Sequence, residues 1–479
     1  MRKRILPALL AFVLLASQAL ATWSIVVVNL ETGEVAVATA TCLEGFNIRR
    51  ATPVLIPGVG VATAQSAVDN WGSRVMIHDG MLAGDSLKQI LADLASADNL
   101  HQLRQYGIVN MKGEALTFTG AQAGAWKGGM IGQSGPLVYA IQGNVLSGDK
   151  VVLEAEQALL NTPGDLAEKI MAAMEAAAAF GGDGRCSCNM VQPTSCGNPP
   201  PPPFKSAHIA CFLIGRPGDV LTSCTTNNGC AKGNFYLALN EKDLTAADPD
   251  PVLLLRQDYD AWRAALAGVP DAIHSEVIAP QDRVDAGQNQ TLTYILSLAD
   301  VNSQWIGQGG CTITLAHAEG TQSEATLLGF TDHQDGTYSV DIQPATNPGM
   351  DHLLFLVDDG SGPVTLWPPT GLMHTPWLQV DPLIGGVQAE LKISGAQANG
   401  PASFAFSLAG PGPSMTPWGM VNLSSPIRAL ATIGTNAEGD ASVNVPIPSG
   451  FPGRPVWIQA GYLNSNGLTI SNPIATELQ

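Results

Sequence analysis

Apolar positions in the first half of the chain occur in short, nearly continuous runs that predict paired β-strands. The runs at 22–29 and 35–41 flank the turn sequence Glu-Thr-Gly-Glu at 31–34, which predicts a hairpin buried on at least one face. Further strands are predicted at 58–64, 106–111, 115–119 and 137–142, and later at 207–215 and 220–225. This part of the chain therefore favours antiparallel sheet.

Helical periodicity appears between these groups of strands. Leu87, Ile90, Leu91 and Leu94 follow the helical i, i+3, i+4, i+7 spacing after a Ser86 or Asp85 cap. Helices are also predicted at 151–160, at 165–179, where Asp165 and Glu168 have capping-box spacing, and around 255–266. Groups of strands separated by helical pairs favour an α+β fold in which two packed sheets are covered by helices.

The pattern changes twice further along the chain. Residues 185–205 hold three cysteines and five consecutive prolines, which predicts an extended, disulfide-braced insertion that serves as a loop or as a lid over a ligand. From 273 the helical stripes disappear, and short alternating strands predict an immunoglobulin-like β-sandwich at 273–370 and a second β-sandwich at 371–479. Spacer or adhesive roles are expected for both.

The N-terminus has the features of a signal peptide. Met-Arg-Lys-Arg precedes an apolar run at 5–16 and the small-x-small sequence Ala19-Leu20-Ala21, so residues 1–21 are expected to be removed. A membrane anchor is the alternative, but the run falls short of the roughly 20 residues that span a bilayer, and Pro7 interrupts it. We expect a secreted, periplasmic or cell-surface protein with no membrane span after cleavage.

Charge and cysteine content narrow the class of protein. The formal charge is −18, and loss of Arg2, Lys3 and Arg4 takes it to −18 − 3 = −21, which disfavours nucleic acid as a partner. Six of the eight cysteines lie between Cys186 and Cys230 and predict disulfides whose pairing the sequence leaves open. A metal site at Cys186, Cys188, Cys196 and His208 is a weaker alternative, because the paired C-x-x-C spacing is absent. Cys42 and Cys311 are read as buried thiols or as a long-range pair.

Cleavage after Ala21 would place Thr22 first in the mature chain. A threonine hydroxyl is a poor nucleophile without a base, and a terminal α-amine with a reference pKa of about 7.7–8.0 can serve as that base at neutral pH. The sequence contains no G-x-S-x-G, H-E-x-x-H or G-x-x-x-x-G-K-[ST] motif, so serine-hydrolase, zincin and nucleotide-hydrolase readings lack support.

Several short motifs, taken together and in order, carry a resemblance to a known family. They are Thr22-Trp-Ser-Ile-Val, Gly33-Glu-Val-Ala-Val-Ala, Gly58-Val-Gly-Val-Ala-Thr-Ala-Gln, Phe118-Thr-Gly, Gln142-Gly-Asn and Gly181-Gly-Asp. The region 22–272 resembles the bacterial family named domain of unknown function 1028, of the N-terminal-nucleophile (Ntn) hydrolase superfamily. The resemblance implies a four-layer αββα sandwich for residues 22–272. The sequence departs from the family pattern after Arg185, where the insertion begins.

Roles for particular residues follow as hypotheses from their chemistry and their positions in the predicted strands. Thr22 would be the nucleophile and, through its amine, the general base. Asn144 is a candidate oxyanion donor or a turn residue, and Asp183 and Arg185 are candidates to orient the amine or bind a substrate carboxylate, or form a structural ion pair. The remaining candidates are the substrate-binding residues Gln65, Asn70 and Gln142, and the alternative nucleophiles Ser24 and Cys42.

The expected activity is therefore cleavage of a C–N amide bond in a peptide or small molecule, without cofactor or metal. The alternative is a catalytically silent fold that binds a cell-surface polymer. The resemblance to this superfamily is also compatible with a homo-oligomer.

Overall fold

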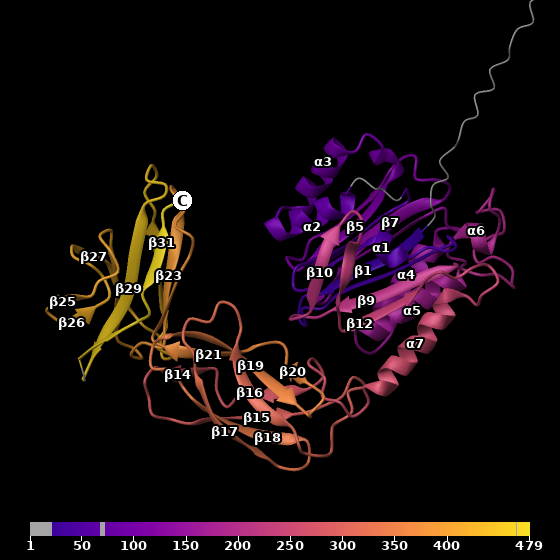
Figure 1. Cartoon of the computed structure of the whole chain (residues 1–479). Helices are drawn as coiled ribbons and strands as arrows, with labels where there is room; N and C mark the ends of the chain where they lie inside the picture. Colours follow the sequence, from indigo (N-terminus) through magenta and orange to yellow (C-terminus); the bar gives the residue numbers. More distant parts are fainter. Residues whose placement is uncertain (1–21, 68–71, 466) are drawn as a thin grey trace, which may run out of the picture. The chain divides into compact units, whose positions relative to one another are not determined.

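The computed structural model describes residues 22–67, 72–465 and 467–479, so the predicted signal peptide lies outside the described residues. The chain forms two compact units, the first ending at Ala264 and the second comprising Ala265–Gln479. The first unit mixes helices and strands, and the second is built of strands, so the predicted α+β class holds (Figure 1). The finer division of the second unit at 370 stays a prediction.

The first unit contains two sheets built mainly of antiparallel pairs. The first sheet has the spatial order β12 (Leu237–Glu241), β9 (Ile209–Gly215), β2 (Val35–Thr41), β1 (Thr22–Asn29), β8 (Leu137–Asn144) and β7 (Lys127–Ser134). The second has the order β10 (Val220–Thr225), β11 (Gly229–Asn234), β3 (Pro53–Ile56), β4 (Gly60–Gln65), β5 (Gln105–Asn110) and β6 (Ala115–Thr119). β1 lies inside its sheet, bonded to β2 on one side and β8 on the other.

The helices of this unit form two groups (Figure 1). One group is α2 (Ser73–Ala83) and α3 (Leu87–Ala97); the other is α4 (Lys150–Asn161), α5 (Leu166–Ala179) and α7 (Pro251–Ala265). The short helical turns are α1 (Ile48–Ala51), α6 (Gly184–Ser187) and the 3-10 turn η1 (His101–Leu103). The caps act as predicted, since the Ser86 hydroxyl accepts from the Gln89 N–H and the Asp165 carboxylate accepts from the Glu168 N–H.

Three apolar cores explain how these layers pack. Trp23, Ile25 and Val27 of β1 face α4, α5 and α7, whereas Val26 and Val28 face the second sheet. Strand alternation produces this division, because successive side chains point to opposite faces. A third core lies between the second sheet and α2 and α3. Each sheet therefore has one face on the other sheet and one face under helices.

Two arginines of α7 hold this helix against α5. Arg256 bonds Glu175 at 2.8 Å and Glu168 at 3.1 Å, and Arg263 bonds Asp165 at 2.9 Å. The forked guanidinium suits such contacts with several carboxylates. The boundary between the two units, after Ala264, lies at the C-terminal end of α7.

Several elements were missed by the sequence pattern. The strand β7 has the sequence Lys-Gly-Gly-Met-Ile-Gly-Gln-Ser, whose glycines weaken strand propensity, yet it pairs with β8 along its whole length. The strands β3, β11 and β12 and the helix α2 were also not predicted. The predicted strand at 137–142 extends to Asn144, which places Asn144 inside the strand instead of after it.

The disulfides correct the predicted cysteine cluster. Cys42 pairs with Cys186, so it is neither a buried thiol nor a candidate nucleophile. Cys188 pairs with Cys196 inside the insertion, and Cys224 pairs with Cys230. Cys211, which belongs to the predicted cluster, is instead a buried free thiol, as is Cys311. These disulfides are consistent with an oxidising compartment.

The strands of the second unit form two groups that share no sheet. In the first group, one sheet has the order β13 (Glu276–Ile278), β15 (Leu292–Ser297), β18 (Thr337–Gln343) and β17 (Thr326–Asp332). The other sheet of this group has the order β14 (Arg283–Asp285), β21 (Thr370–Thr375), β19 (Gly349–Asp358) and β16 (Thr312–His317), with β20 (Pro363–Thr365) beside β19. In the second group, one sheet has the order β22 (Trp377–Val380), β23 (Gln388–Ser394) and β28 (Ala441–Pro446). The other sheet has the order β27 (Ile427–Gly434), β24 (Pro401–Ser407), β29 (Pro455–Asn464) and β30 (Gly467–Ile470), with β31 (Ile474–Glu477) beside β29. A separate hairpin consists of β25 (Ser414–Thr416) and β26 (Gly419–Val421). Each group encloses its own apolar core, as expected for β-sandwiches.

Among the described residues, no helix combines the length and the apolar character needed to cross a bilayer.

Candidate functional site

The space between the two sheets of the first unit is apolar at one end and polar at the other. Thr22 and Ser24 lie on the same face of β1 as the core residues Val26 and Val28, as alternation requires. The polar end is lined from neighbouring strands by Thr22, Ser24, Thr39, Thr63, Gln65, Gln105, Gln142 and Asn144, all buried. Burying so many polar groups costs free energy unless they bond one another, so this end of the core is built around a hydrogen-bond network.

Gln65 connects β4 to the first residues of β1. Its amide nitrogen donates to the Thr22 carbonyl at 2.9 Å, and its amide oxygen accepts from the Ser24 hydroxyl at 2.5 Å. The Ser24 hydroxyl also lies 2.8 Å from Thr39 Oγ1 on β2. One glutamine therefore fixes both hydroxyl-bearing residues at the start of β1.

A second glutamine extends this network. Gln105 of β5 accepts from Gln65 at 2.9 Å, and its own amide nitrogen donates to Thr119 and to the Gly143 carbonyl, each at 2.9 Å. Gln142 lies opposite Ser24 in the β1–β8 register and donates to Thr63 at 2.6 Å. The two sheets are thus joined by side-chain amides at this end.

Asn144 lies opposite Thr22 in the β1–β8 register. Its side-chain nitrogen donates to the Ala123 carbonyl at 3.1 Å, and the Ser66 hydroxyl lies 3.4 Å from the same oxygen. A role as oxyanion donor would require the amide to share its N–H groups with this carbonyl. The structure places Asn144 next to the proposed nucleophile, whereas its role remains a prediction.

Two backbone conformations near the network are unusual. Ser66 follows Gln65 with a φ of 82°, and Val145 follows Asn144 with a φ of 54°. A β-branched residue rarely adopts a positive φ, and such strained residues persist where the surrounding structure holds them, often at functional sites. Both residues are buried, and neither conformation was predicted from the sequence.

Asp183 and Arg185 form a buried ion pair beside the end of β2. Arg185 Nη2 lies 2.8 Å from Asp183 Oδ2, and this carboxylate also accepts from the Cys42 N–H at 2.7 Å. Arg185 Nη2 lies 3.5 Å from Thr41 Oγ1, the last residue of β2. These contacts support the structural ion pair that the sequence analysis weighed, and they place the pair near the strand ends that carry Thr22 and Asn144.

His208 lies beside the Cys42–Cys186 disulfide. Its Nδ1 is 3.8 Å from the Cys42 sulfur, and burial lowers the pKa of His208, with Lys205 lowering it further. These three side chains are close enough to hold a metal ion, but the disulfide consumes both thiols, so this trio has no thiolate ligand to offer. The metal site considered from the sequence also lacks thiolate ligands, because Cys188 and Cys196 are bonded to each other and Cys186 to Cys42.

The predicted site residues therefore come together around the start of β1, except that Asn70 lies outside the described residues. Thr39, Thr63 and Gln105 were not predicted as site residues. Their contacts join residues that lie 15, 79 and 40 positions apart in the sequence, so they resemble ordinary strand residues.

Comparison with known protein families finds a match to part of this region. Residues 22–191 match a family of unknown function, DUF1028. The DUF1028 match begins at Thr22 and ends before residue 272, the limit that the sequence motifs suggested. The chain has no significant match among curated proteins.

Solved structures with partial similarity include a Silicibacter pomeroyi protein described with the DUF1028 model. It is 18% identical, with a TM-score of 0.37, and the match covers 50% of this chain and 88% of that protein. The Escherichia coli adhesin FdeC is 10% identical, with a TM-score of 0.18, and the match covers 95% of this chain and 96% of the adhesin. Invasin, a bacterial integrin-binding protein, is 11% identical, with a TM-score of 0.19, and the match covers 95% of this chain and 60% of invasin.

Proposed function

We propose that the first unit is an Ntn-type αββα sandwich that hydrolyses an amide bond, with Thr22 as its N-terminal nucleophile. The observation that carries this proposal is the buried polar network that surrounds the start of β1 at one end of an otherwise apolar inter-sheet core. An ordinary core has no need of hydroxyls and amides from several strands at one spot, since every such group must find a partner.

Two further observations support the proposal. The family match begins at Thr22, the residue that the expected cleavage would expose. The positive φ angles at Ser66 and Val145 flank the same network, and backbone strain of this kind clusters at active sites.

The chemistry follows from the position of the threonine. Thr22 Oγ1 attacks the amide carbonyl carbon while its proton passes to the free α-amine, and the carbonyl oxygen becomes an oxyanion. The C–N bond then breaks as the leaving amine takes that proton, which leaves an acyl ester on Oγ1. Water attacks this ester, with the α-amine again as base, and releases the acid.

The neighbouring residues have positioning roles in this scheme. Gln65 holds the Thr22 carbonyl and the Ser24 hydroxyl, which fixes the direction in which the first residues of β1 point. Asn144, opposite Thr22, is the candidate donor to the oxyanion. Asp183 and Arg185 hold the end of β2 through Cys42 and Thr41. Gln142, opposite Ser24, is a candidate substrate-binding residue.

The test uses the full chain from residue 22 onward, released with a native Thr22 amine, and an electrophilic β-lactone probe. We expect one acyl adduct on Thr22 by intact mass and peptide mapping, and none in Thr22→Ala. Ser24→Ala is the matched control, since it removes a hydroxyl from the same face of the same strand. A chain carrying one extra residue before Thr22 should also stay unlabelled, because its base is gone.

Equal labelling of Thr22→Ala would refute the proposal. Failure of every chain to react, with Thr22 proven to be the first residue, would instead favour the catalytically silent binding module.

A further inference from the structure

The sandwich formed by β22–β31 has a cavity of about 370 Å³ that is partly open to solvent and is lined largely by residues of its core. Protein interiors are close-packed and rarely leave voids much larger than a water molecule, whereas small-molecule pockets occupy about 300–1,000 Å³. The size of this cavity is therefore that of a ligand site. It belongs to the second unit and is independent of the site at Thr22.

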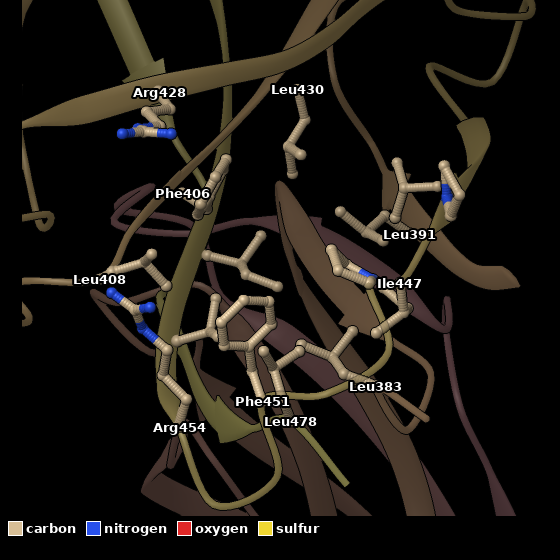
Figure 2. Close-up of a pocket in the computed structure, with 15 residues that line it drawn as sticks. Leu383, Leu391, Phe406, Leu408, Arg428, Leu430, Ile447, Phe451, Arg454 and Leu478 are labelled. Atoms are coloured by element: carbon tan, nitrogen blue, oxygen red, sulfur yellow. The ribbon is translucent and has the colours of Figure 1, made fainter. Parts of the chain in front are cut away.

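The cavity lies where the two sheets of the sandwich end. β27 is the edge strand of one sheet and β28 the edge strand of the other, and both contribute to the wall. Leu391 of β23 and Phe406 of β24 line its interior, with Leu430 of β27 (Figure 2). Because the cavity is partly open to solvent, a long apolar ligand can enter it from this edge.

Arg428 and Arg454 also line this otherwise apolar cavity. Figure 2 shows both guanidinium groups on the same side of the pocket, near Leu408 and Phe406. Between residues 377 and 479 the chain has three basic residues, the third being Lys392, and five acidic ones. Two of the three basic residues thus line the cavity, and none of the five acidic residues does.

The two arginines have no carboxylate partner among the described residues. Arg428 is exposed, and Arg454 lies 5.9 Å from the ring of Phe451, which itself lines the cavity. In a chain with a formal charge of −18, an unbalanced pair of cations beside an apolar space favours an anionic group with an attached hydrocarbon.

We propose that this cavity binds an aliphatic carboxylate, with the hydrocarbon chain between the sheets and the carboxylate at Arg428 and Arg454. A guanidinium pairs with a carboxylate through parallel N–H bonds, and the aliphatic lining gains from each methylene that leaves water. A free fatty acid and the acyl chain of an anionic lipid share this chemistry, and of the two the free fatty acid is the ligand of this site.

Isothermal titration calorimetry of the full chain with decanoate tests the site. We expect saturable binding by one decanoate, about fourfold tighter binding for each added methylene from octanoate to decanoate, and much weaker binding of decan-1-ol. Arg428→Gln and Arg454→Gln should each weaken decanoate binding about tenfold. Lys392→Gln on β23 is the matched control, since it removes an exposed positive charge away from the cavity and should leave binding unchanged.

A second variant tests the apolar part. Leu430→Trp should fill the cavity and abolish binding, with retention of the native thermal transition as the check on folding. Equal affinity for decanoate and decan-1-ol, or decanoate binding unaffected by both arginine substitutions, would overturn the proposal. Binding to phosphatidylglycerol vesicles with no binding of free decanoate would also overturn it, in favour of a lipid surface.

Discussion

The Cys42–Cys186 disulfide should contribute more to the stability of the first unit than either of the other two. It closes a loop with a sequence separation of 144, whereas Cys188–Cys196 spans 8 and Cys224–Cys230 spans 6. The conformational entropy that a crosslink removes from the unfolded chain grows with the logarithm of loop length. The resulting stabilisation is about 5 kcal/mol for the long loop and about 2–2.5 kcal/mol for each short one.

The perturbation is the double substitution Cys42→Ala and Cys186→Ala, with Cys188→Ala and Cys196→Ala as the matched control. The alanines keep the N–H of residue 42, so its bond to Asp183 survives and the change isolates the crosslink. A unit of this size loses about 2–4 °C in Tm per kcal/mol, so we expect a fall of about 10–20 °C for the long loop and about half of that for the control.

Differential scanning calorimetry of the full chain resolves this transition from that of the second unit, which holds none of the three disulfides. Equal falls in Tm for both variants would refute the argument from loop length. A shift of the second unit's transition would show that the two units do not unfold independently.

Three further outcomes are expected. Asp183→Ala should cost the first unit about 3–5 kcal/mol by urea unfolding, because Arg185 loses its buried carboxylate, and adding Arg185→Met should recover part of the loss. Gln65→Leu should cost about 1–3 kcal/mol, because the Thr22 carbonyl loses its Gln65 donor, and it should also slow β-lactone labelling of Thr22. Burial lowers the pKa of His374 in the second unit, so as pH falls below about 6.5 the unfolded chain takes up a proton more readily than the folded chain. The free energy of unfolding should therefore decrease toward lower pH. His374→Phe should reduce the difference between the free energies of unfolding measured in urea at about pH 8 and about pH 5.

The strands that the sequence predicted most accurately are those whose own residues determine them. The strands at 22–29 and 35–41 were predicted to the residue, because their β-branched and apolar runs are bounded by a clear turn. β7 and α2 were missed for the opposite reason. The first is glycine-rich and depends on its pairing with β8, and the second starts and ends at glycines in the left-handed conformation, without a polar side-chain cap.

Some members of the buried polar network were named from the sequence, but their arrangement was not. The family resemblance singled out Thr22, Gln65 and Asn144, yet sequence alone contains no register that would place Asn144 opposite Thr22. Thr39 and Gln105 act through bonds to partners 15 and 40 residues away, so no local pattern marks them. The pairing of Cys42 was open for the same reason, since its partner lies 144 residues along the chain.

The position of α7 has a mechanical consequence. Since the second unit continues directly from this helix, any tension along the chain from the second unit enters the first unit at the C-terminal end of α7. The ion pair nearest that end joins Arg263 and Asp165. About two turns earlier in the helix, Arg256 pairs with Glu168 and Glu175. Pulling would break these pairs in sequence and peel the helix from α5. β1 lies between β2 and β8 and shares an apolar core with α7, so detachment of the helix would uncover the core behind the strand that carries Thr22.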